Sequence, residues 1–169
     1  MDLKWDYQLK PGQRSNPVVH VEQVDLPASI VIPGDADLLK VFKTGGYRLQ
    51  TWGRPKDASG KDIRKMAAHW IAVRGGTPLH TDPAYPRYSH HLKIRVDPGT
   101  FVRGMNKVEL ELARGMFYIL DAHSPHQVFH KLEPKAWNVA VSIDNDRPII
   151  VEQAIAACLR YAEKGGILA

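Results

Sequence analysis

The chain has 169 residues, of which 44% are apolar and 24% are charged. This ordinary globular composition excludes wholesale disorder, and no apolar run approaches the roughly 20 residues that a membrane-spanning helix needs. The single cysteine, Cys158, excludes an internal disulfide and any multi-cysteine metal site, so a metal would have to be held by histidine and carboxylate groups.

The length fits one domain over residues 1–169, and the start of the chain has no apolar signal segment. We therefore expect a cytoplasmic protein with no membrane partner. Lysine and arginine exceed aspartate and glutamate by 23 to 18, which favours an anionic substrate or partner only weakly. No feature of the sequence predicts an oligomeric state.

Short segments that alternate apolar and polar residues, or are rich in Val, Ile and aromatics, predict strands. In chain order they are 18–24, 29–32, 47–52, 67–73, 91–96, 107–112, 116–120, 127–130 and 137–143. Their close spacing indicates a mainly β protein, a sandwich or barrel. Helices are expected only at the edges, over 36–43 with Asp35 as N-cap and over 151–164, where Cys158 would be a buried thiol. The polar stretch 53–62 predicts a surface loop.

Two groups of residues offer metal ligands. In the segment TPLHTD, His80 and Asp82 are two residues apart, so on an extended strand both side chains leave the same face. The segment DAHSPHQV supplies a further histidine after an apolar strand, either His123 or His126. We favour His126, because Pro125 before it and Gln127-Val128 after it mark the start of a strand. Two histidines and one carboxylate form a facial triad that leaves positions open, as in non-haem Fe(II) oxygenases.

The order HxD, then PHxV, then a basic residue nine positions on resembles the Fe(II)/2-oxoglutarate-dependent dioxygenases, most closely the prolyl-hydroxylase-like branch. The similarity covers roughly residues 66 to 146. It implies a double-stranded β-helix (a jelly-roll, cupin-like fold) with one or two flanking helices, and a site at the barrel mouth. It also implies His80, Asp82 and His126 as catalytic metal ligands, with Fe(II), 2-oxoglutarate and O2 as cofactor and co-substrates.

In this family a basic residue inside the barrel holds the far carboxylate of 2-oxoglutarate. The resemblance ranks Lys135 first for this role, by its distance from His126. Arg95 ranks second, because other relatives use the strand after HxD, where Lys93 and Arg95 are expected to share a face.

The implied reaction hydroxylates an amino-acid residue of a protein or peptide, or a small amino-acid-like molecule, and releases succinate and CO2. Two alternatives remain open: the same chemistry on a nucleic-acid base, or a metal-containing β-barrel that binds without catalysis. Aromatic and basic residues expected around the mouth fit either a stacked base or a peptide. They are Tyr47, Gln50, Trp52, His69, Trp70, Tyr85, Arg87, Tyr88, His90 and His91, with an exposed position left open for His90 and His91.

Overall fold

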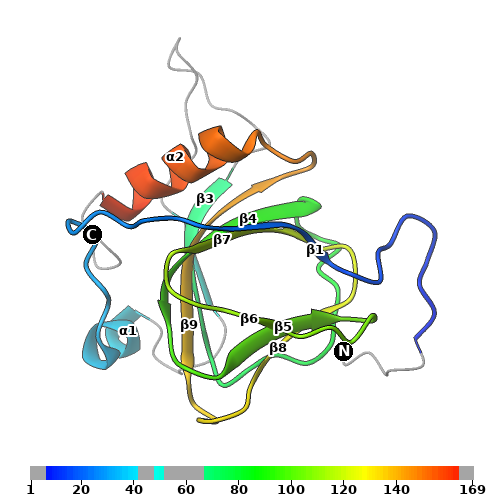
Figure 1. The fold of residues 1–169 in the computed structure, drawn as a ribbon, viewed down its shortest axis with the longest axis horizontal. Coiled ribbons are helices and arrows are strands. Elements are labelled where there is room, and N and C mark those ends of the chain that lie inside the picture. Colours follow the sequence, from blue (N-terminus) through cyan, green and yellow to red (C-terminus); the bar gives the residue numbers. More distant parts are fainter. Residues whose placement is uncertain (1–6, 42–47, 52–66, 164–169) are drawn as a thin grey trace.

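The computed structural model describes residues 7–41, 48–51 and 67–163 (Figure 1). Along these residues the elements are β1 (Val18–Gln23), α1 (Asp35–Val41), β2 (Arg48–Thr51), β3 (Ala67–Arg74), β4 (Tyr88–Val96), β5 (Thr100–Gly104), β6 (Leu110–Glu111), β7 (Met116–Asp121), β8 (His126–His130), β9 (Trp137–Asn145) and α2 (Val151–Glu163). None of the helices within these residues combines the length and apolar character that a membrane crossing requires.

The strands form two antiparallel sheets that face each other (Figure 1). The large sheet has the order β1-β7-β4-β9-β3-β2 and the small sheet the order β6-β5-β8. An antiparallel bridge between His80 and His126 places the segment around His80 beside β8, at the edge of the small sheet. From β3 onward the chain thus crosses between the sheets in the order of a double-stranded β-helix. This confirms the mainly β fold with flanking helices that the sequence predicts.

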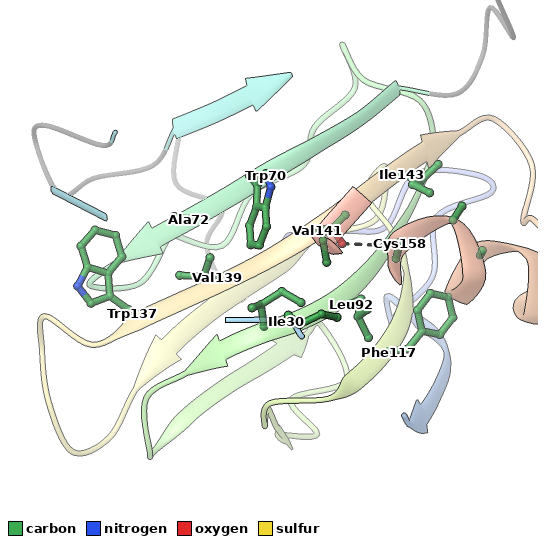
Figure 2. Close-up of a cluster of buried hydrophobic side chains, with 14 of the residues drawn as sticks. Ile30, Trp70, Ala72, Leu92, Phe117, Trp137, Val139, Val141, Ile143 and Cys158 are labelled. Carbon is green, nitrogen blue, oxygen red and sulfur yellow. Dashed lines mark hydrogen bonds between the residues drawn. The ribbon is translucent and has the colours of Figure 1, made fainter. Parts of the chain in front are cut away.

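The largest apolar cluster lies on the outer face of the large sheet, under α2 (Figure 2). On β9 the residues Trp137, Val139, Val141 and Ile143 belong to this cluster, whereas Asn138, Ser142 and Asp144 line the space between the sheets. The alternation follows from the period of two in a β-strand, whose successive side chains leave opposite faces. One strand therefore supplies both the core and the wall of an internal cavity.

Helix α2 packs closely on the sheet because its buried stripe consists of small residues, Ala154, Ala157, Cys158 and Ala162. Cys158 is fully buried, and its Sγ lies 3.8 Å from the carbonyl oxygen of His90. Burial raises the pKa of this thiol to about 12. The expected buried thiol is confirmed, and it is not a reactive one.

Three sequence expectations differ from the structure or lie outside the described part of it. Residues 29–32 form no strand, because Pro27 and Pro33 flank them and Ile30 closes a turn onto the Pro27 carbonyl. Strand β5 was not anticipated, since its sequence TFVRG does not alternate apolar and polar residue types, although its burial alternates in the structure. The loop expected over 53–62 lies outside the described residues.

Leu92 tests the role of the outer core, because it is fully buried on β4 and faces away from the internal cavity. Leu92→Ala should lower the free energy of unfolding by roughly 2–5 kcal/mol, through lost burial and a residual cavity. The metal affinity of the folded protein should be unchanged. Urea denaturation measures the first effect, and Val31→Ala, at a side chain that is 77% exposed, is the control with little expected loss.

Candidate metal centre

A cavity lies between the two sheets and holds about 690 Å³ of space, part of it open to solvent. The part of it that the centres of water-sized molecules can reach is about 70 Å³. Inward-facing side chains of β3, β4, β7, β8 and β9 line it, together with residues from the segment 77–85. Most of the polar lining comes from the large sheet, on the face opposite the apolar core.

His80, Asp82 and His126 meet at this cavity, and one potential ligand atom from each lies within 4.8 Å of the others. Asp82 Oδ2 is 3.1 Å from His126 Nε2 and 3.6 Å from His80 Nε2. The backbone bridge between the two histidines fixes their spacing, and Asp82 N donates to the Ala122 carbonyl 2.9 Å away. His126 is the first residue of β8, as predicted, while Asp82 follows the bridge rather than lying on a strand.

Both imidazoles present Nε2 to a metal, because each Nδ1 is occupied by a backbone carbonyl. His80 Nδ1 lies 2.6 Å from the Pro78 oxygen, and His126 Nδ1 lies 2.8 Å from the Ser124 oxygen. A carbonyl can only accept, so Nδ1 carries the proton and the Nε2 lone pair remains for coordination. Outer hydrogen bonds of this kind orient histidine ligands in metal sites.

The electrostatics of the three groups also fit a cation. Burial raises the pKa of Asp82, but hydrogen bonds from His126 and His80 outweigh it and hold that pKa well below its usual range. The hydrogen bond to Asp82 in turn raises the pKa of His80. A divalent metal would replace the protons that these groups otherwise share, so the residues present fit such an ion.

The turn that carries His126 is braced by a buried carboxylate, Asp121. It accepts hydrogen bonds from Arg87 Nε and Nη2, at 3.2 and 3.0 Å, and from Ser124 Oγ at 2.9 Å. The alternative ligand, His123, also lies in this turn, but its Nε2 is 2.8 Å from the Tyr85 carbonyl. The structure therefore brings His126, and not His123, to the group of potential ligands.

A buried lysine lies in the same cavity. Lys93 on β4 is 2% exposed, and its Nζ lies 3.5 Å from the Tyr118 hydroxyl and 4.8 Å from the Tyr118 ring centre. Across the described residues it pairs with no carboxylate. Desolvation lowers the pKa of Lys93 to about 7 and raises that of Tyr118. His91, two residues earlier, stacks on Tyr118 at 5.0 Å and has a buried Nδ1 without a partner.

The structure places Lys135 and Arg95 away from the cavity. Lys135 is exposed in the turn before β9. Arg95 is held outside the barrel by Asp97 at 3.0 Å and Asp35 at 2.7 Å. It does not share a face with Lys93, because a bulge in the β4–β9 pairing between these residues interrupts the alternation. The sequence analysis expected Lys135 or Arg95 inside the barrel. Among the described residues that line the cavity, the lysine or arginine found there is Lys93.

A third polar group lies on the large sheet. Asp144 accepts hydrogen bonds from Ser89 at 2.8 Å and Ser142 at 3.1 Å, and its Oδ2 is 3.6 Å from His69 Nε2. Sequence reasoning assigned no role to Asp144. The signal was present, because the alternation along β9 places it on the inward face with Asn138 and Ser142.

The aromatic and basic residues expected at the mouth are distributed differently. His69, Tyr85 and His91 line the cavity, whereas Trp70 and His90 are buried on the outer face of the sheet. His90 is not exposed: its Nδ1 lies 2.8 Å from the Ile143 oxygen, and its Nε2 accepts from Ile149 N at 2.9 Å. The remaining residues of this set are Arg87, which braces Asp121; Tyr88, which packs at the edge of the outer core; Gln50, on β2; and Tyr47 and Trp52, which lie outside the described residues.

No known family model matches this chain, and no curated protein matches it significantly. Among solved structures, a cupin 2 domain-containing protein from Halorhodospira halophila is similar, with 16% sequence identity and a TM-score of 0.39. That alignment covers 72% of this chain and 83% of the other.

Replacement of His126 tests the metal centre. His126→Ala should weaken Fe(II) binding by more than about 100-fold, because even outer-shell partners of metal ligands contribute 10–100-fold. His123→Ala should bind Fe(II) as the wild type does, since its imidazole is engaged by the Tyr85 carbonyl. Anaerobic equilibrium dialysis with Fe(II) measures both. Loss of the metal in His123→Ala with retention in His126→Ala would transfer the ligand role to His123.

Proposed function

We propose that this protein is an Fe(II)- and 2-oxoglutarate-dependent oxygenase that hydroxylates an amino-acid residue in a protein or a small amino-acid-like substrate. The observation that carries the proposal is the presence of two sites in one cavity. His80, Asp82 and His126 bring together three potential metal ligands, and Lys93 is a buried amine that pairs with no carboxylate of the described residues.

The three ligands favour a metal that works with open coordination positions. Two imidazoles and one carboxylate on one side of an octahedral ion leave three positions for other molecules. A closed structural zinc site would instead have four protein ligands, usually including cysteines. Among the described residues the cluster has three members, and the chain's lone cysteine is buried on the face of α2 that packs against the large sheet.

Lys93 favours a dianionic co-substrate. A buried ammonium without a carboxylate partner is unfavourable, and a ligand carboxylate would restore its full charge. 2-Oxoglutarate carries two carboxylates: one would bind at the metal that His80, Asp82 and His126 would hold, and Lys93 would hold the other. The Tyr118 hydroxyl beside Lys93 Nζ would donate a second hydrogen bond to the distal carboxylate.

When bound, Fe(II) and 2-oxoglutarate supply an oxidation in which O2 is split between the substrate hydroxyl group and succinate, with release of CO2. The protein's own residues orient the co-substrate and exclude water from the reacting atoms.

Variants of two lysines test this assignment in the anaerobic protein. Addition of Fe(II) and then 2-oxoglutarate to the wild type should give the weak visible charge-transfer band of the chelated co-substrate. Lys93→Met should bind Fe(II) normally but weaken 2-oxoglutarate binding by about 30-fold or more, because loss of one partner of a buried charge pair costs roughly 2–5 kcal/mol.

Lys135→Met is the matched control and should titrate as the wild type does, because Lys135 is exposed and away from the cavity. A folded, iron-loaded wild type that shows no band with 2-oxoglutarate would contradict the proposed function. The metal-containing binding module would then explain the metal ligands better.

The pH dependence of co-substrate binding provides a second test. Lys93 has a pKa of about 7 in the empty cavity, so below this pH the ammonium is already charged and binding needs no added proton. Above it, binding must take up a proton, and the affinity for 2-oxoglutarate should fall by up to tenfold per pH unit. Titrations from pH 6 to 9 should show this slope in the wild type and a flatter profile in Lys93→Met. Parallel profiles for the two proteins would exclude Lys93 as the titrating group.

A further inference from the structure

The polar wall of the cavity carries opposite charges at two places. Asp144 is paired in register with Ser89, and Lys93 lies four residues further along β4. At about 3.3 Å per residue, their backbones are roughly 13 Å apart along the sheet, too far for an ion pair. Lys93 and Asp144 therefore do not neutralise each other, and each is available to a different ligand group.

The hydrogen bonds of Asp144 leave one oxygen available. Oδ1 accepts from both serine hydroxyls, whereas Oδ2 lies 3.6 Å from His69 Nε2, which is longer than a hydrogen bond and is an ion-pair contact when that imidazole is protonated. The residue is 5% exposed and lines the cavity. Oδ2 can thus accept a hydrogen bond from a molecule in that cavity.

His91 adds a second buried polar group to the wall of the cavity. It lines the cavity, is 7% exposed, and its Nδ1 has no hydrogen-bond partner. It lies on the inward face of β4 between Ser89 and Lys93. Buried polar atoms in native proteins are nearly always hydrogen-bonded, so this nitrogen, shielded from solvent beside Tyr118, is an uncompensated polar group next to the cavity.

We propose that Asp144, flanked by His69, is the subsite that selects the substrate to be hydroxylated, and that it takes a cationic nitrogen group, an ammonium or guanidinium. This inference rests on the proposed function, because it assigns the region around Lys93 to 2-oxoglutarate and the region around Asp144 to the second substrate. The substrate class is then a basic amino-acid side chain, free or within a peptide.

The charges support this division. Burial raises the pKa of the Asp144 carboxyl, with His69 and the two serines opposing it, so a cationic ligand would relieve the cost of the buried carboxylate. A carboxylate of 2-oxoglutarate would instead be repelled there. Asp144 thereby also favours one orientation of the co-substrate, with its distal carboxylate at Lys93.

The test compares two probes that differ in one terminal group, N-acetyl-L-lysinamide and N-acetyl-L-norleucinamide. Each is titrated by calorimetry into the anaerobic protein loaded with Fe(II) and 2-oxoglutarate, after the charge-transfer band has been recorded. The lysine probe should bind at least tenfold more tightly than the norleucine probe. Asp144→Asn, which keeps the shape of the side chain, should abolish that difference, and Asp25→Asn, at an exposed carboxylate, should preserve it.

The outcomes separate this inference from the proposed function. With the band present, equal or absent binding of the two probes overturns the substrate assignment and leaves the oxygenase proposal intact. With the band absent, the oxygenase proposal fails, while a lysine preference that depends on Asp144 in the metal-free protein would still support the subsite. The comparison of probes on the wild type holds even where Asp144→Asn folds poorly, and tighter binding of an N-acetyl-glutamate amide than of the lysine probe would overturn the assigned charge.

Discussion

The alternation of side chains along β3, β4 and β9 is the constraint on which both the core and the candidate site depend. Leu92 and Val141 face α2 and the outer core, while Lys93 and Ser142, one residue further along each strand, face the cavity. Because the period is two, a slip of one residue in either strand would bury the site's charges in the core and expose apolar side chains to the cavity. The outer core therefore fixes the register that positions the site.

The space between the sheets is lined by buried polar side chains, and burial of such groups lowers the stability of the fold. Between the sheets, the described residues form a smaller apolar cluster that includes Val102, Leu120 and Val128. The main core lies on the outer face of the large sheet. The wall of the cavity instead holds Lys93 and His91 Nδ1, which find no counter-ion and no hydrogen-bond partner among the residues that the structure describes. Such groups are unfavourable in an empty protein and become favourable when a ligand pairs with them, as is common at functional sites.

The group of three potential metal ligands could be predicted from the sequence because local patterns define it: HxD supplies two members, and the strand start at Pro125-His126 supplies the third. The buried lysine, Lys93, could not be located by counting residues from His126. Lys135 falls in an exposed turn, and the bulge after Lys93 directs Arg95 to Asp97 and Asp35. Strict alternation from Ser89 would have selected His91 and Lys93, but a bulge in a long-range pairing leaves no local signal. For Asp144 the alternation along β9 gives the inward face, but its neighbours Ser89 and His69 come from other strands and cannot be predicted from the local sequence.

Because Lys93 and Asp144 lie apart along the sheet, the two ends of the cavity differ in charge. Had the two residues been opposite each other on β4 and β9, they would have formed a buried ion pair and left nothing for a ligand to complete. The register instead places Ala140 opposite Lys93 and Ser89 opposite Asp144. Within the described part of the chain Lys93 therefore has no carboxylate partner, and Asp144 has serine hydroxyl donors and a 3.6 Å contact with His69. An anionic group is favoured near Lys93 and disfavoured near Asp144. The potential metal ligands come from the opposite side of the cavity. This difference in charge would direct an anionic and a cationic molecule to different ends of one cavity.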